Sequence, residues 1–152
     1  MVGTIVVVFF ADSFLTPFTA FLTTLGVVIA AWGGVMLADI ALRHKDYDEP
    51  SLFTPSGRYG SVNWGAVASL VVGSLVGWGL VVNASASWLS WQGYLLGPLG
   101  GREGDWAGAN IGILLAMVVG FGGYWATSAG RVRAQEKLPS RTYAEGAEED
   151  AQ

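Results

Sequence analysis

The chain has 152 residues, of which 52% are hydrophobic and only 13% are charged, and its formal net charge is −4. Soluble domains are about 25% charged, whereas residues 13–38, 59–101 and 106–130 carry no charge at all. A soluble helix needs a polar face, and runs of this kind do not provide one. The composition therefore excludes an ordinary soluble domain and predicts an all-α membrane protein that contacts the lipid bilayer.

The first predicted element is a partial helix over residues 1–11. At about 1.5 Å per residue it reaches only half way across a bilayer. No Lys or Arg precedes this run, so it lacks the basic start of a signal peptide. We expect Asp12, Ser13 and Pro17 to form a tight turn before the first full span, which covers about 18–40.

Two further full spans are predicted, at about 61–83 and about 107–129. Asn63 or Ser61 is placed to cap the start of the second span. The remaining stretch, 131–152, is polar and lacks apolar periodicity. We expect this stretch to be a disordered tail.

The basic residues indicate which way the spans run. They gather between the first two spans and after the third, and Arg102 alone lies between the second and third. Because Lys and Arg accumulate in cytoplasmic loops, we expect a multi-pass protein of the cell inner membrane with a cytoplasmic C-terminus. Asp39 and Arg43 are one helical turn apart and are expected either to pair at this interface or to form a solvated helix end.

Small residues recur at every fourth position of each span. Such stripes let helix backbones approach closely inside a membrane, although a glycine-rich composition alone would also produce some of them. The predicted packing positions are Gly26, Ala30, Gly34 and Ala38 in the first span, Gly65, Ser69, Gly73 and Gly77 in the second, and Gly108, Gly112, Ala116 and Gly120 in the third.

Aromatic residues cluster near both ends of the spans, as in the aromatic belts of membrane proteins. Those at the inner boundary include Tyr47, Trp64, Tyr124 and Trp125, and we interpret them as anchors, with a ligand-binding box as the less favoured alternative. The outer stretch 84–106 is expected to lie along the interface.

The residue inventory argues against catalysis. The chain has no Cys and a single His, so it lacks thiolate ligands and a haem-binding pair of histidines. No charge lies in the middle of a span, and no base is placed to activate a Ser or Thr. We expect no enzyme, no metal site, no cofactor and no nucleic-acid partner.

Residues 18–70 resemble a known family. The first span ends in Gly34, Val35, Ala38 and Asp39, and the basic residues Arg43 and Lys45 follow. A loop with Tyr-Asp and Leu-Phe pairs then leads to a Gly-x-Tyr…Asn-Trp start of the second span: Tyr47, Asp48, Leu52, Phe53, Gly57, Tyr59, Asn63 and Trp64. This combination resembles the carboxyl-terminal part of nucleobase:cation symporters of the purine–cytosine permease type.

The resemblance implies a twelve-helix fold of the leucine-transporter type, in which these spans would be the last helices. It implies a fragment of a secondary active transporter that takes up a nucleobase-like small molecule. The coupling ion, Na⁺ or H⁺, is expected only in the complete transporter, together with the remaining transporter helices as partners. Because solute sites of this design lie on broken helices, this part would supply scaffold and gate helices without a substrate site.

The resemblance also suggests an outer gate on the first span, for which the candidates are Phe18, Phe21, Leu22 and Leu25. Ordinary lipid-facing or bundle-facing residues are the alternative for these positions. Two other hypotheses remain for the chain itself. It is either a stand-alone structural or regulatory membrane protein that oligomerises or docks through its small-residue faces, or a half-transporter completed by a separately encoded partner.

Overall fold

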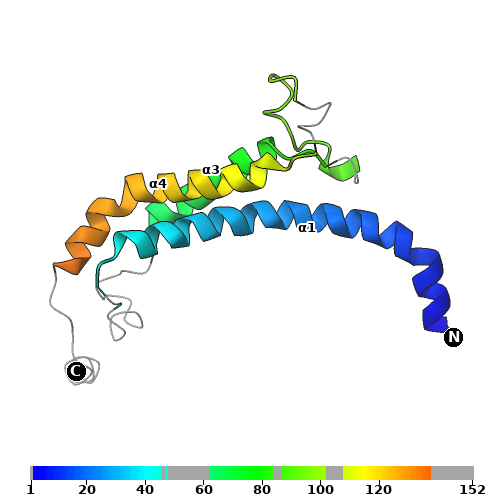
Figure 1. The fold of residues 1–152 in the computed structure, drawn as a ribbon, viewed down its shortest axis with the longest axis horizontal. Coiled ribbons are helices and arrows are strands. Elements are labelled where there is room, and N and C mark those ends of the chain that lie inside the picture. Colours follow the sequence, from blue (N-terminus) through cyan, green and yellow to red (C-terminus); the bar gives the residue numbers. More distant parts are fainter. Residues whose placement is uncertain (1, 46, 48–61, 84–86, 102–107, 138–152) are drawn as a thin grey trace.

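The computed structural model describes residues 2–45, 47, 62–83, 87–101 and 108–137. All of the regular structure in these ranges is helical and none of it is strand, so the all-α prediction is confirmed there. Three helices run side by side, α3 and α4 against one side of the longer α1 (Figure 1). Their bounds are α1 Val2–Leu42, α3 Trp64–Gly79 and α4 Ile111–Glu136, and a short 3-10 turn, η1, covers Ser87–Leu89.

Helix α1 is continuous where a tight turn was predicted. Pro17 lies inside the helix, so the predicted separation into a partial helix 1–11 and a span 18–40 is wrong. A helix keeps its backbone groups bonded in hydrocarbon, where unpaired groups are costly, and this favours continuing through the proline. The Thr19 hydroxyl donates to the carbonyl of Leu15 at 2.8 Å on the turn around Pro17.

The two long helices meet the length and composition needed to cross a membrane over Leu15–Leu42 and Ile111–Glu136, whereas α3 is shorter. Helix α3 ends at Gly79 and not at 83, because the N–H of Leu80 turns back to the carbonyl of Gly77 at 3.0 Å. Its predicted cap is confirmed: the Asn63 side chain accepts hydrogen bonds from the N–H groups of Gly65 and Ala66. The predicted Ser61 alternative lies outside the described residues.

Helix α4 is displaced along the chain from the predicted span. It begins at Ile111 because Asn110 adopts a left-handed conformation with φ 48°. It continues to Glu136, so the prediction of a disordered tail from 131 is wrong for 131–136. The last turn buries Val132 and Gln135, and this burial holds it in the helix. Residues 138–152 of the predicted tail lie outside the described residues.

Small residues allow the three helices to approach closely. A Cβ added at Gly34 of α1 would lie 2.1 Å from the carbonyl oxygen of Met117, and one at Gly120 of α4 would lie 2.4 Å from that of Ala31. One added at Gly112 would lie 2.3 Å from the carbonyl oxygen of Gly77. At these three glycines the neighbouring helix backbones are so close that any residue with a Cβ would push them apart.

The other predicted packing positions divide into three groups. Buried positions are Ala38, Ser69, Gly73, Gly77 and Ala116. Gly26, Ala30 and Gly65 are half-buried, and on α1 the fully buried neighbours are Val27 and Ala31. Gly108 precedes α4 and nothing lies within 4 Å of its added Cβ, so its prediction as a packing residue is wrong: the left-handed Asn110 separates it from the helix.

Candidate functional site

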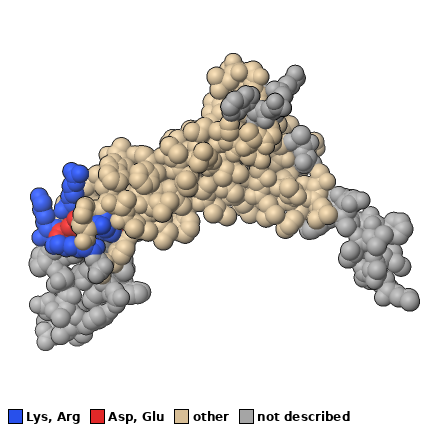
Figure 2. Space-filling view, viewed as in Figure 1, with Lys and Arg blue, Asp and Glu red and all other residues tan. Residues whose placement is uncertain are grey.

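Charged side chains gather at one end of the helices. Figure 2 shows them there, next to a surface that is otherwise uncharged over the described side chains. This end combines the C-terminal ends of α1 and α4 with the N-terminal end of α3. This end therefore carries the charged side chains of the described residues, and we take it as the candidate site.

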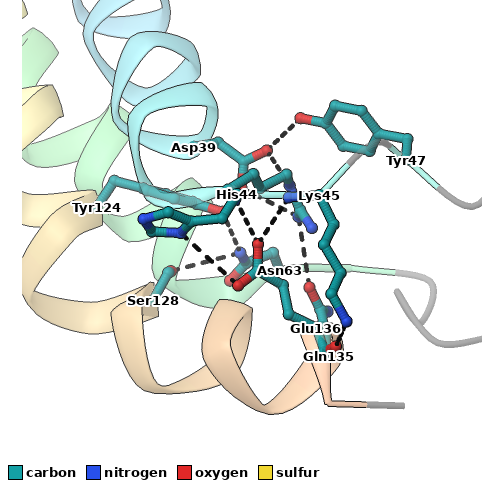
Figure 3. A network of polar contacts seen from close by, with 10 residues as sticks. Asp39, His44, Lys45, Tyr47, Asn63, Tyr124, Ser128, Gln135 and Glu136 are labelled. Atoms are coloured by element: carbon teal, nitrogen blue, oxygen red, sulfur yellow. Dashed lines mark hydrogen bonds and ion pairs between the residues drawn. The ribbon is translucent and has the colours of Figure 1, made fainter. Parts of the chain in front are cut away.

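The carboxylate of Asp39, on the last full turn of α1, is the centre of the site (Figure 3). Its Oδ2 accepts from Arg43 Nε at 2.8 Å and from the Tyr47 hydroxyl at 2.5 Å. Its Oδ1 accepts from Arg43 Nη2 at 3.1 Å and from the Tyr124 hydroxyl. The predicted Asp39–Arg43 pair is thus confirmed, and two tyrosines complete it.

The environment explains why Asp39 needs so many donors. The side chains of Arg43 and Asp39 are only 12% and 17% exposed, and a charge this close to hydrocarbon is costly unless it is paired. Burial alone would lower the pKa of the Arg43 guanidinium, but its hydrogen bond to Asp39 raises that pKa overall. The Arg43 guanidinium therefore stays charged beside the Asp39 carboxylate.

Tyr47 lies just after the end of α1, and its hydroxyl donates to the same Asp39 carboxylate. The Arg43 guanidinium lies over the Tyr47 ring, 4.6 Å from its centroid, which is a cation–π geometry. Burial raises the pKa of the Tyr47 phenol, and its hydrogen bond to the Asp39 carboxylate raises it further. Tyr47 is therefore a neutral donor at physiological pH.

Asn63 connects this site to the start of α3. Its Oδ1 caps the helix, and its Nδ2 donates to the Tyr124 hydroxyl and to Ser128 Oγ, each at 3.4 Å. One side chain thus joins the beginning of α3 to α4, while Tyr124 joins α4 to α1. The three helices are tied at this end by a single set of hydrogen bonds.

A second group of contacts fixes the last turn of α4 against the end of α1. Glu136 Oε1 accepts from the backbone N–H groups of His44 and Lys45 at 2.5 and 3.2 Å, and Lys45 Nζ donates to the Glu136 carbonyl at 2.9 Å. A cation on a C-terminal carbonyl also complements the helix dipole. Arg43 reaches Gln135 Oε1 at 3.4 Å.

A cavity of about 330 Å³ opens beside these groups. Its lining combines apolar side chains with hydroxyl, amide, carboxylate and guanidinium groups. Such a cavity can bind by hydrogen bonding and apolar contact, and its described lining includes no Ser, Thr, Cys, His or Lys. The residues that line it are Trp32, Val35, Met36, Asp39, Arg43, Tyr47, Asn63, Ala66, Tyr124, Arg131, Val132 and Gln135.

Metal binding has no support at this end. Over the part of the chain that the structure describes, no three His, Cys, Asp or Glu residues lie close enough to hold an ion. The carboxylates of Asp39 and Glu136 are instead occupied by donors from the protein. The hydrogen bonds around Asp39 and Glu136 hold the helix ends together, and several of the same side chains line the cavity.

Sequence reasoning found some of these residues and missed others. Tyr124 was interpreted as an anchor of the aromatic belt, and this is wrong because only 4% of it is exposed. The missed signal is periodicity, because Tyr124 and Ser128 continue the four-residue repeat of Gly112, Ala116 and Gly120. Gln135 and Glu136 were missed because they were assigned to the tail.

The four gate candidates lie elsewhere. Phe18, Phe21, Leu22 and Leu25 are 40–48% exposed on α1, at least one helical turn outside the residues that line the cavity. The structure does not bring them together with the polar site.

Comparison with known proteins decides the family. Residues 1–98 match the model of a family described as permease for cytosine/purines, uracil, thiamine, allantoin. The chain belongs to this permease family. The match includes α1, α3 and the site residues Asp39, Arg43, Tyr47 and Asn63, so the resemblance seen in the sequence is confirmed.

Membership identifies a membrane transport protein, a permease for nucleobases or related compounds, and this family is one of transporters rather than of enzymes. The apolar helices α1 and α4 agree with a membrane location. No curated protein and no solved structure matches the permease chain.

Proposed function

We propose that this chain provides scaffold and gate helices for the cation-coupled uptake of a nucleobase or a related compound. The observation that carries the proposal is the family match, which spans α1 and α3. The transported solute belongs to the classes that the family description names.

The scaffold role is supported by the continuity of the helices. Transporters of this kind bind solute and ion near the membrane midplane, on helices that are broken there. Helices α1, α3 and α4 have no break within their bounds, and residues 18–38 and 112–130 carry no charge. Solute recognition is accordingly assigned to other helices of the transporter.

The orientation is part of the proposal. Lys and Arg mark cytoplasmic ends. Arg43 and Arg131 line the cavity of the candidate site, Lys45 bonds to Glu136 beside it, and Arg133 lies on the last turn of α4. We place this end in the cytoplasm of a multi-pass inner-membrane protein. A reporter fused after Gln152 then behaves as cytoplasmic, and a periplasmic signal would contradict this orientation.

Solute uptake tests the function. In the native host, stripped of other nucleobase permeases, deleting the gene should reduce uptake of labelled cytosine, uracil, hypoxanthine or allantoin, and complementation should restore it. Unchanged uptake of all four would contradict transport.

Expression of the chain alone tests the scaffold role separately. In a host without nucleobase uptake, we expect no uptake above the vector control. Uptake by the chain alone would show that it carries a solute site and would overturn the scaffold role, while leaving the transport function in place.

A further inference from the structure

The segment after α3, residues 87–101, presents an apolar and aromatic surface. It contains no Asp, Glu, Lys or Arg, yet Leu99 is 73% exposed and Trp88 is 59% exposed. Trp91, Tyr94 and Leu95 are exposed on the same segment. A loop that faced only water would not be expected to concentrate these side chains.

Much of the backbone of this segment is bonded within the protein. The N–H groups of Gly93 and Leu95 donate to the carbonyls of Trp78 and Gly79 at the end of α3, each at 2.9 Å. The Tyr94 hydroxyl donates to the carbonyl of Leu75. Further N–H groups bond within the segment itself, namely those of Ser90, Gln92, Leu96, Gly97, Gly100 and Gly101.

The polar side chain in the middle of the segment points inward. Gln92 is only 2% exposed, and its Nε2 donates to Thr24 Oγ1 of α1 at 3.0 Å. Leu89, which is 1% exposed, packs with Ala20 of α1. The segment thus has two sides, one that packs on α1 through Gln92 and Leu89 and one on which large apolar and aromatic side chains are exposed.

Two glycines make this arrangement possible. Gly93 and Gly100 have φ of 74° and 67°, a conformation that favours glycine. They let the segment fold back on itself and extend sideways from the end of α3 (Figure 1). An apolar cavity of about 310 Å³ lies where it meets α4, lined by Leu80, Leu96, Leu99, Gly100, Gly101 and Ile111.

We propose that residues 87–101 are embedded in the lipid interface opposite the Lys/Arg-rich end, with acyl chains covering Leu99 and the exposed aromatic residues. Eight backbone N–H groups of the segment are bonded inside the protein and it carries no charge, which suits a lipid environment. Trp and Tyr prefer the depth of the interface. The surface continues the exposed apolar face of α3 at Leu75, through the bond from Tyr94. This inference rests on the membrane location of the family and not on the solute.

Single cysteines test the proposal without background, because the chain has no Cys. The full chain carrying Trp91→Cys or Leu99→Cys is spin-labelled in phosphatidylcholine vesicles, and collision with oxygen and with a water-soluble nickel complex is measured. Leu114→Cys, exposed on α4, is the hydrocarbon control. Lys45→Cys is the water control, and Leu89→Cys is the protein-buried control.

We expect labels at 91 and 99 to show an oxygen-to-nickel collision ratio several-fold above that at Lys45 and below that at Leu114. A ratio like that at Lys45 would place the segment in water and overturn the proposal. Low collision with both reagents, as at Leu89, would show that protein covers the segment and would also overturn it. A variant is scored only if its circular dichroism matches the parent chain.

Discussion

The hydroxyl of Tyr124 on α4 donates to the carboxylate of Asp39 on α1. The two residues are 85 positions apart in sequence, and their contact closes the end of the helix bundle where the charges lie. Small residues bring α1 and α4 close enough for this bond, and Asn63 extends it to α3. The polar site therefore depends on the close packing at the glycines. A substitution that separates α1 from α4 should also break the hydrogen bonds of the polar site.

Tyr124→Phe should destabilise the bundle by about 1 kcal/mol, because hydrogen bonds between membrane helices contribute up to about 2 kcal/mol. Tyr47→Phe is the matched control, since it removes a donor to the same carboxylate from a side chain that is 43% exposed. Thermal unfolding in detergent measures both. If Tyr47→Phe lowers stability as much as Tyr124→Phe does, the buried hydrogen bond contributes no more than the exposed one.

Asp39 and Arg43 should show strong coupling in a double-mutant cycle. Arg43→Gln leaves a partly buried carboxylate with only its tyrosine donors, and Asp39→Asn leaves an unpaired guanidinium. We expect the double variant to be more stable than the sum of the single losses implies, with a coupling free energy of about 1–3 kcal/mol. Additive single losses, measured by unfolding in the same detergent, would mean that the pair is a solvated helix end.

Gly33 and Gly34 are adjacent and should respond oppositely to alanine. At Gly34 the new Cβ would meet the Met117 carbonyl at 2.1 Å, whereas nothing lies within 4 Å at Gly33. Gly34→Ala should cost about 1–3 kcal/mol through overpacking. Gly33→Ala should be neutral or stabilise by up to about 1 kcal/mol because alanine favours helix.

Thermal unfolding of the two alanine variants at equal detergent concentration gives the comparison. Equal losses of stability would indicate a general intolerance of α1 to substitution. A harmless Gly34→Ala would show that α1 and α4 separate easily, and the close approach would then contribute little.

Much of this packing could be predicted from the sequence, and the exceptions have physical reasons. The stripe through Gly112, Ala116 and Gly120 follows helical periodicity, which is a local property. Pro17 misled the prediction because its local penalty favours a turn, while the cost of unpaired backbone in hydrocarbon favours a helix. The third helix begins later than predicted, at Ile111, because Asn110 adopts a left-handed conformation that its sequence context did not reveal.

The candidate site was only half predictable for a related reason. Asp39 and Arg43 share one helix face, so their spacing reveals the pair. Tyr124 and Gln135 reach that pair across long sequence separations, and single-sequence reasoning contains no signal for such a contact. Their position on the repeat of α4 could have indicated burial, but not the partner.

The Tyr47 phenol should lose its proton at a higher pH than an ordinary tyrosine. Its pKa is raised above the ordinary value of 10.0 by burial and by the bond to Asp39. The folded chain thus holds this proton more tightly than the unfolded chain, so the contribution of Tyr47 to stability is complete below pH ~10 and is lost as pH rises through the raised pKa. The pKa of Tyr47 is measured from the difference in phenolate absorbance between the parent chain and Tyr47→Phe as pH rises.

Asp39→Asn provides the control for this titration, because it removes the acceptor and its negative charge while keeping the shape of the side chain. The Tyr47 pKa should then move down toward its ordinary value. An unchanged titration in Asp39→Asn would mean that burial alone sets the pKa, and that the bond in Figure 3 is not formed at high pH.

The gate hypothesis for α1 predicts a loss of transport without a loss of stability. Phe18, Phe21, Leu22 and Leu25 are exposed, so truncating Phe21 to Ala leaves no buried cavity and should change unfolding by less than about 0.5 kcal/mol. If the side chain closes the outer path, uptake in the native host should fall several-fold at equal protein level. Ile40→Ala, exposed near the opposite end of α1, is the control, and an equal fall there would show that lipid contact rather than gating is affected.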